Sequence, residues 1–417
     1  MAERNQVQPD LSFVKGVMEA GGDTVNRCYQ CATCSIVCPL STDESPFPRK
    51  EMLWAQWGLG SKVAGDADVW LCHNCGDCTK YCPRDARPGD VLSAIRINAI
   101  KHYAQPKALA NIMNSAGGVI STVIASMLAV MVVAFLWSLY TKEAFPIPEG
   151  TVVYHKFLTV VPIDALYLSI FGLVAYASIK GVLQFWSDIS KGAGLRDSYT
   201  GKAAVPALGP FLVKYVWPAI KEILTHERFK KCGEVAERAT GHLWVLWSFI
   251  ILFAVTIIVM IQADVLAILF PNAGFETPLV QYHPVKIAAN IGAVMLIAGV
   301  WMLRNMRNQK TAEGTITSST QDWILIWLIF AVGVSGVAAE IIRLADVAIL
   351  AYPVYVLHLG CVATLFLSIP YSKFAHLLYR TTAYVHERWA RDVRAGKAGF
   401  GLEKMVTAWQ YEGKDIH

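Results

Sequence analysis

Charged side chains are scarce in this sequence. Asp, Glu, Lys and Arg make up 17% of its 417 residues, whereas a typical soluble domain carries about 25%. Apolar residues account for 54%, and the mean hydropathy is +0.40. This composition excludes an ordinary soluble protein. The net charge of +5 is small and its basic residues are sorted by loop, so it does not indicate nucleic-acid binding.

The apolar residues gather in the later part of the chain. Residues 1–112 are polar and cysteine-rich, whereas residues 113–380 contain six apolar stretches. These approach or exceed the length of about 20 residues that crosses a bilayer as a helix. A buried helix of a soluble protein is usually shorter and keeps a polar face, so six such stretches predict a multi-pass membrane domain. The predicted spans are 117–139, 157–186, 242–266, 284–303, 323–343 and 353–379.

The connecting segments predict the orientation in the membrane. Segments on the side of the N-terminus hold 19 Lys and Arg residues, and segments on the other side hold 4. The positive-inside rule then predicts a protein of the inner membrane with both termini in the cytoplasm. The N-terminal-side segments are 187–241, 304–320 and 379–417, and the opposite segments are 140–156, 264–286 and 343–352.

Eight of the ten cysteines form two runs with the same spacing, C-x2-C-x2-C-x3-C-P. Structural zinc sites favour pairs of C-x2-C hooks instead. A disulfide framework is expected in a small secreted domain, but the N-terminus is polar and shows no secretory signal. In two-cluster ferredoxins the fourth cysteine of each run ligates the other [4Fe–4S] cluster. The predicted ligands are Cys28, Cys31, Cys34 and Cys82 for the first cluster, and Cys72, Cys75, Cys78 and Cys38 for the second. The two other cysteines, Cys232 and Cys361, are predicted to be structural.

Histidines near the span ends form candidate haem sites. His358 and His376 are 18 residues apart on the last predicted span, which places both on one helix face about 27 Å apart. His242 lies level with His376, so these two predict a bis-histidine haem b at the cytoplasmic side. His358 predicts an outer haem whose second ligand is His283 or His155. The alternative that the protein binds a single haem is left open. Polar groups in spans are costly and usually functional, whereas a lone histidine at a span end is often interfacial.

Lys286 is the candidate residue of a quinone site. It lies one turn inside the fourth predicted span, and Asn290 shares its helix face. A cation at this position is predicted to donate a hydrogen bond to a quinone carbonyl. The alternative is that the Lys286 side chain extends to the lipid headgroups. Glu340 and Arg343, spaced i,i+3, are predicted to pair with each other.

These residues resemble a known arrangement. The segment Cys72–Pro83 resembles the small iron–sulfur subunit of heterodisulfide reductases. Arg238–His242, His283–Lys286 and Pro370–His376 resemble the haem b membrane subunit of those enzymes and, more distantly, the gamma subunit of respiratory nitrate reductase. In the nitrate reductase pattern the second ligand of the outer haem falls at Leu252, so that ligand does not carry over.

The two parts fused in this order resemble the QmoC family, the membrane subunits of the quinone-interacting oxidoreductases of sulfate reducers. The resemblance implies haem b, with two haems expected and one at minimum, and menaquinone as the lipid substrate. It also implies QmoA- and QmoB-like flavin and iron–sulfur subunits as partners, and adenylylsulfate reductase as the eventual electron acceptor.

The expected fold is mainly α. A cytoplasmic α-helical two-cluster ferredoxin-type domain (1–112) precedes a six-helix transmembrane haem b and quinone domain (113–380) and a cytoplasmic tail (381–417). The predicted function is an electron-transfer subunit that links the menaquinone pool to soluble partners. The alternatives are a membrane anchor with redox-sensing clusters and a subunit of a heterodisulfide reductase-like complex. An ion pump is disfavoured because Glu340, Arg343 and Lys373 lie near span ends.

Overall fold

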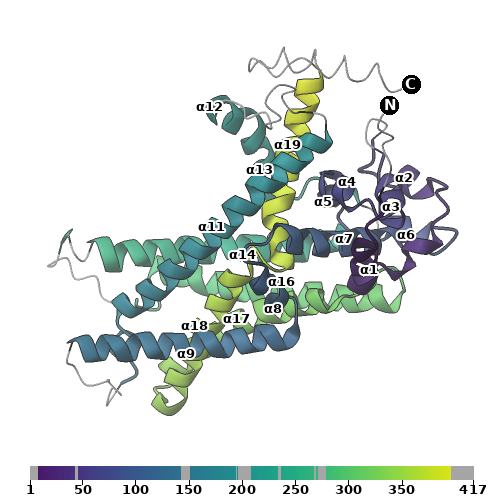
Figure 1. Cartoon of the computed structure of the whole chain (residues 1–417). Coiled ribbons are helices and arrows are strands. Elements are labelled where there is room, and N and C mark those ends of the chain that lie inside the picture. The colour runs from purple at the N-terminus through teal and green to yellow at the C-terminus, as the bar shows by residue number, and fades with distance from the viewer. Residues whose placement is uncertain are drawn as a thin grey trace.

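The computed structural model describes residues 8–42, 46–141, 151–193, 195, 208–232, 236–266, 269–270 and 279–395. Within these ranges all regular structure is helical, which confirms the predicted mainly α fold. Long helices form a bundle, and a domain of short helices lies at one end of it (Figure 1). The end of the bundle that contacts this N-terminal domain is called the near end, and the opposite end is the far end.

The N-terminal domain consists of short helices because two cysteine loops interrupt it. Ala32 and Gly76 adopt positive φ values of 68° and 97° and turn the chain between successive cysteines. The longest helix, α7 (Pro88–Tyr103), begins at a proline, which costs no hydrogen bond in the first helical turn. The other helices are α1 (Leu11–Val17), α2 (Thr33–Ile36), α3 (Arg49–Gln56), α4 (Gly60–Ala64), α5 (Asp68–Leu71) and α6 (Asp77–Lys80), and α8 (Lys107–Met113) leads to the bundle.

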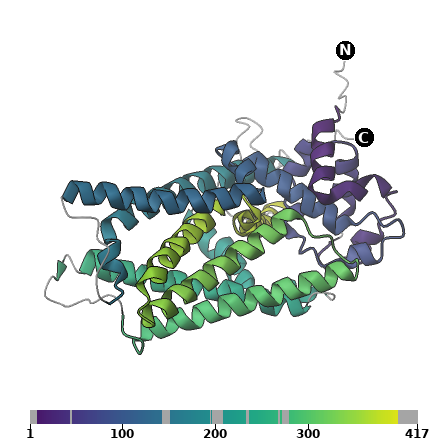
Figure 2. The same cartoon turned by 90° about the horizontal axis from the view of Figure 1, so that it is seen from below.

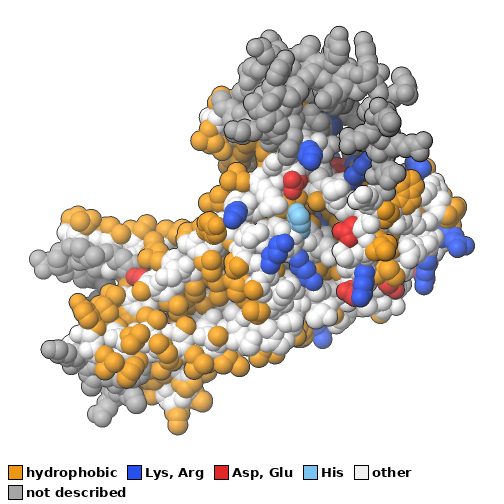
Figure 3. Space-filling model, in the orientation of Figure 1, with side chains coloured by type: hydrophobic (Ala, Val, Ile, Leu, Met, Phe, Trp, Pro, Cys, Tyr) orange, Lys and Arg blue, Asp and Glu red, His pale blue; other side chains and the backbone are white. Residues whose placement is uncertain are grey.

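Six helices in the described part of the chain are long and apolar enough to cross a membrane, so the chain is a multi-pass membrane protein. Apolar side chains such as Ile120 and Leu128 point outward from the bundle. Hydrophobic side chains cover the visible bundle surface, whereas charged ones gather toward the N-terminal domain (Figure 3). The six helices are α9 (Ala116–Thr141), α11 (Val160–Gly192), α14 (Ala236–Met260), α16 (Pro284–Ala312), α17 (Thr320–Leu344) and α18 (Ala348–Ser368).

Neighbouring helices of the bundle pack in a continuous series. α14 contacts α16, α16 contacts α17, α17 contacts α18, and α18 contacts α9, beside which α11 lies. Figure 2 shows α17 and α18 between α9 and α16. A Cβ atom at Gly299 would lie 3.0 Å from the Gly241 carbonyl and 3.0 Å from Trp244, so the glycine permits close packing of α16 on α14.

The last predicted span is wrong in its extent. Helix α18 ends at Ser368, and α19 (His376–Arg394) begins only after a short break. Pro370 lies in this break, where it lacks the N–H that would continue the helix. His358 and His376 therefore do not lie on one helix, and the axial separation calculated for a continuous helix does not apply.

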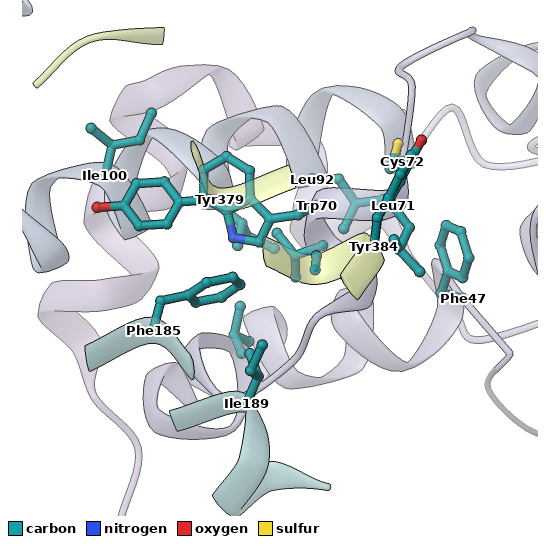
Figure 4. Packing of buried hydrophobic residues seen from close by; sticks show 14 of the residues in the cluster. Phe47, Trp70, Leu71, Cys72, Leu92, Ile100, Phe185, Ile189, Tyr379 and Tyr384 are labelled. Atoms are coloured by element: carbon teal, nitrogen blue, oxygen red, sulfur yellow. The ribbon is translucent and has the colours of Figure 1, made fainter. Parts of the chain in front are cut away.

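Helix α19 leaves the bundle and packs against the N-terminal domain. Its Tyr379 ring lies 5.0 Å from the Trp70 ring and 5.4 Å from the Phe185 ring, measured between centroids (Figure 4). Trp389, further along α19, is fully buried. Residues 381–394, predicted as the start of a tail, therefore belong to a hydrophobic core. Residues 396–417 of the predicted tail lie outside the described residues.

The short helix α13 (Trp217–Thr225) lies beside α19, and another short helix, α12 (Leu208–Phe211), precedes it. Glu222 of α13 pairs with Arg388 of α19, and its other oxygen lies 2.5 Å from Arg228. Arg228 in turn contacts Glu387 of α19 at 2.6 Å. This ion-pair network holds α13 and Arg228 against α19. A further one-turn helix, α10 (Tyr154–Phe157), precedes α11.

Candidate functional site

The structure gathers the predicted cluster cysteines into two pockets. The first cysteine pocket is lined by three thiols of the first run and one of the second: Cys28, Cys31, Cys34 and Cys82. The second cysteine pocket has the reciprocal composition: Cys72, Cys75, Cys78 and Cys38. This exchange of the fourth cysteine is the arrangement used by two-cluster ferredoxins.

The chemistry of the pockets fits iron–sulfur clusters. All eight cysteines are free thiols, and four soft sulfur donors per pocket suit iron. Burial raises the pKa of Cys34 and of Cys38 to about 12. These thiols therefore keep their protons at neutral pH unless a metal replaces them, so cluster binding must release protons. The identity of each ligand stays a prediction.

A fifth thiol lies at the second cysteine pocket. Cys232, which is 1% exposed, lines this pocket and belongs to a small core against which Cys75 packs. It was predicted to be a structural residue because no other cysteine is near it in the sequence. The fold brings it to the pocket from the segment before α14, and no spacing pattern in the sequence could have revealed this. Cys361 lies among apolar side chains of the bundle, as expected for a structural residue.

Two arginines of the membrane domain hold the loop of the second cysteine pocket. Arg380 of α19 donates hydrogen bonds to the carbonyls of Trp70 (2.9 Å) and Cys72 (2.8 Å). Arg238 of α14 donates to the carbonyl of His73. Their positive charges favour the anionic thiolates that ligate a cluster. The near end of the bundle and the second pocket are therefore one structural unit.

The predicted histidine pair is brought together at the near end. The rings of His242 and His376 lie 6.0 Å apart between centroids, at an interplanar angle of 73°. The His376 Nδ1–H donates to the Lys373 carbonyl at 2.7 Å. His242 Nδ1 lies 2.7 Å from Nε2 of a third histidine, His226, which sequence analysis missed. His226 follows α13 in a left-handed conformation with φ 54° and is buried. Its contact with His242 is visible only in the folded structure.

Hydrogen bonds define the tautomers of these rings. The His226 Nδ1–H donates to the Ile223 carbonyl at 2.7 Å, so its Nε2 must accept from the His242 Nδ1–H. Burial lowers the pKa of His226, which favours this neutral form. His242 and His376 are then both left with Nε2 as a lone-pair donor, and neither Nε2 takes part in a hydrogen bond among the described residues.

This arrangement fits a metal held between two imidazoles. Metal–imidazole bonds of about 2.0 Å would place the two ring centroids about 6 Å apart, which agrees with the observed 6.0 Å. Histidine ligands also usually donate their second N–H to a carbonyl or another acceptor, as both rings do here. His242 and His376 therefore suit the axial ligands of a haem.

A series of rings connects the histidine pair to the second cysteine pocket. The His73 ring, beside Cys72, contacts the Phe229 ring at 4.9 Å. Phe229 contacts His242 at 5.8 Å. His73 also lies 3.0 Å from the Tyr384 hydroxyl, and burial with the nearby Arg380 charge lowers its pKa. The pocket and the histidine pair are thus joined by direct packing.

The structure does not bring together the predicted ligands of an outer haem. His358 Nδ1 lies 3.1 Å from the Ser335 hydroxyl. Among the described residues no hydrogen bond or ring contact joins His358 to His283 or to His155. His283 instead caps α16 by accepting from the Val285 N–H at 3.2 Å, and His155 is exposed. The outer haem stays a prediction.

Lys286 forms an ion pair at the far end. Its Nζ lies 2.7 Å from Glu340 of α17, and Asn290 donates to the same carboxylate at 3.4 Å. The prediction that Glu340 pairs with Arg343 is wrong, because the neighbouring helix α16 supplies a closer cation. These side chains form a polar cluster between α16 and α17.

Comparison with known proteins gives two kinds of similarity. Residues 118–399 match the family model described as citrate utilization protein B, and residues 24–86 match that of the 4Fe-4S dicluster domain. Citrate utilization protein B of Escherichia coli is 25% identical over 388 residues, which cover 89% of this chain and 91% of that protein. No solved structure matches this chain.

The cluster domain has its own relatives. One subunit of the H(2):CoB-CoM heterodisulfide,ferredoxin reductase of Methanothermobacter marburgensis is 33% identical over 93 residues, 22% of this chain and 50% of that protein. A heterodisulfide reductase subunit-like protein of Archaeoglobus profundus is 30% identical over 105 residues, 25% of this chain and 56% of that protein. The chain thus spans about half the length of these two proteins. Their similarity to its N-terminal part supports an iron–sulfur electron-transfer domain. Because the first family model covers more than half of the sequence, the chain belongs to the citrate utilization protein B family.

Proposed function

We propose that this chain is the quinone-reactive, electron-transfer subunit of a membrane oxidoreductase complex. It would connect menaquinone in the bilayer to soluble flavin and iron–sulfur partner subunits. Two [4Fe–4S] clusters and haem b would supply the one-electron chemistry, and the residues of the chain hold, space and insulate them. The observation that carries the proposal is the His242–His376 pair, packed next to the second cysteine pocket.

The near end has the features needed to hold redox groups at fixed spacing. His226 and the Lys373 carbonyl hold the two axial histidines by their Nδ1 atoms. Arg238 and Arg380 hold the loop that carries Cys72. These hydrogen bonds restrain the positions of the two histidine rings and of the loop that carries Cys72.

The quinone site is assigned to the Lys286 cluster. A quinone carbonyl is a hydrogen-bond acceptor, and the Lys286 ammonium is a donor that Glu340 holds between two helices. Quinol oxidation also releases protons, for which the Glu340 carboxylate is a suitable acceptor. The distribution of basic residues supports an N-terminal domain in the cytoplasm, and with it a quinone site toward the opposite side of the membrane.

Two observations point to different soluble partners. The cluster domain and its fusion to a membrane domain favour QmoA- and QmoB-like subunits that lead to adenylylsulfate reductase. The relative that matches nearly the whole chain is named for citrate utilization, which favours a partner that serves the use of citrate or a related carboxylate. We favour the second assignment, because it rests on the longer similarity. Isolation of the native complex and identification of its other subunits distinguishes the two.

The central experiment is spectroscopic. The full chain, purified in detergent, should contain two [4Fe–4S] clusters and low-spin haem b by iron, sulfide and optical analysis. His242→Ala and His376→Ala should each abolish the same low-spin signal. His386→Ala serves as the matched control, because this buried histidine lies on the same helix as His376 but contacts Ser190 rather than the pair. Retention of the signal in both variants would refute the assignment.

A further inference from the structure

The second cysteine pocket contains one more thiol than a cubane cluster uses. A [4Fe–4S] cluster takes four cysteine thiolates, and Cys38, Cys72, Cys75 and Cys78 already supply them. Cys232 also lines this pocket. It is held there by its own N–H, which donates to the Phe229 carbonyl at 3.4 Å.

The surplus thiol comes from the membrane domain. Cys232 lies ten residues before His242 and packs in one small core with Phe229 and Ala239. On the cluster side this core contacts Leu40 and Cys75. Cys232 therefore reaches the pocket only when the N-terminal domain is docked on the bundle.

We propose that the Cys232 thiol is a positioning residue of the second cluster that donates an S–H···S hydrogen bond to the Cys75 thiolate and raises the cluster's reduction potential. The inference rests on the proposed function, in which Cys75 is a cluster ligand.

The physical basis is the charge of the cluster. Reduction adds one electron, so the negative charge on the ligand sulfurs increases and a donor hydrogen bond to them becomes stronger. Hydrogen bonds to the sulfurs are among the factors that set the potentials of iron–sulfur clusters. The thiol keeps its proton in both states, and no bond is made or broken. Removal of the donor must therefore favour the oxidised cluster.

The first cysteine pocket offers a comparison within the same chain. There a Gln30 amide donates to Cys28 at 3.4 Å, and Thr33 lies 3.2 Å from Cys31. These partners come from the cysteine loop itself. The second pocket differs because its additional partner, Cys232, comes from a distant segment that also leads to a haem-ligand helix.

The test uses redox titration of the full chain, followed by electron paramagnetic resonance. In Cys232→Ala both clusters should remain, with unchanged iron and sulfide content. The ratio of reduced to oxidised second cluster at a fixed potential should fall about tenfold, equivalent to a shift of about 59 mV. Cys232→Ser keeps an O–H donor and should restore most of the potential. Cys361→Ala removes a buried thiol of the bundle and should change neither cluster.

Two results would overturn the inference. An unchanged potential in Cys232→Ala would show that the thiol does not act on the cluster. Loss of the second cluster's iron in both Cys232 variants would make this residue a ligand instead of a donor. Cys75→Ala combined with Cys232→Ala tests the underlying function separately, because intact iron content in that double variant would remove Cys75 from the ligand set.

Discussion

The histidines at the two ends of the bundle have different surroundings. At the near end, the ring centroids of His242 and His376 lie 6.0 Å apart, and a further group holds each ring by Nδ1. Further toward the far end, His358 contacts a serine hydroxyl and no second imidazole among the described residues. All three were predicted as ligands from their positions near the ends of spans. The comparison shows that a position near a span end does not by itself predict which histidines the fold brings together.

The largest expected effect is the loss of a whole redox centre at the near end. Cys38→Ala removes a predicted ligand of the second cysteine pocket, so non-haem iron should fall from about eight to about four atoms per chain. The first cluster should persist, because Cys38 does not line its pocket. Iron and sulfide analysis with electron paramagnetic resonance measures the loss. Equal damage to both clusters would contradict the crossed arrangement.

The comparison of the two ends is tested most directly with His358→Ala. We expect the low-spin signal of the His242–His376 haem to persist, because no hydrogen bond among the described residues joins His358 to that pair. The haem content per chain is measured by the pyridine haemochrome spectrum. A decrease of one haem assigns His358 to an outer haem, whereas an unchanged content excludes His358 as a required haem ligand. Loss of the near-end signal would contradict the separation of the sites.

A smaller effect is expected from the residue that supports His242. His226→Ala removes the acceptor for the His242 Nδ1–H, and loss of such an outer-shell partner typically weakens metal affinity about 10–100-fold. Haem retention during dilution or competition with apomyoglobin measures this change. His226→Gln keeps an acceptor oxygen and should restore most of the affinity. Equal haem retention in wild type and His226→Ala would exclude the supporting role.

The smallest effect on cofactor content is expected at the far end. Lys286→Ala should leave clusters and haem intact but slow haem reduction by a menaquinol analogue about tenfold, as expected for one lost charged hydrogen bond. Stopped-flow spectroscopy measures the rate. Lys180→Ala is the control, since this lysine is exposed on α11 and contacts Tyr176. Unchanged kinetics in Lys286→Ala would place the quinone site elsewhere.

Local patterns in the sequence predicted much of this structure. The cysteine pockets follow from a spacing that encodes two ligand loops, and the spans follow from hydropathy over lengths that match the bilayer. The break before His376 was also encoded, because Pro370 cannot continue a helix, but the apolar residues around it concealed the signal.

Contacts between distant segments were not predictable in the same way. Cys232 and Cys75 are neighbours only because a loop of the membrane domain crosses the cluster domain. His226 depends on the left-handed turn after α13, which places its ring against His242. Glu340 pairs with Lys286 rather than with Arg343 because two helices pack side by side. Such partners are determined by tertiary packing, which produces no periodic pattern in a single sequence.

The burial of α19 has a consequence for biosynthesis. Trp70 is made early, whereas Tyr379 and Trp389, which complete the same core, are made near the end of translation. Domains usually fold as they emerge from the ribosome, N-terminal part first. Here the core that contains Trp70 is completed only after the six membrane helices and α19 have been made. The hydrogen bonds from Arg380 of α19 to the loop of the second cysteine pocket therefore form late in biosynthesis.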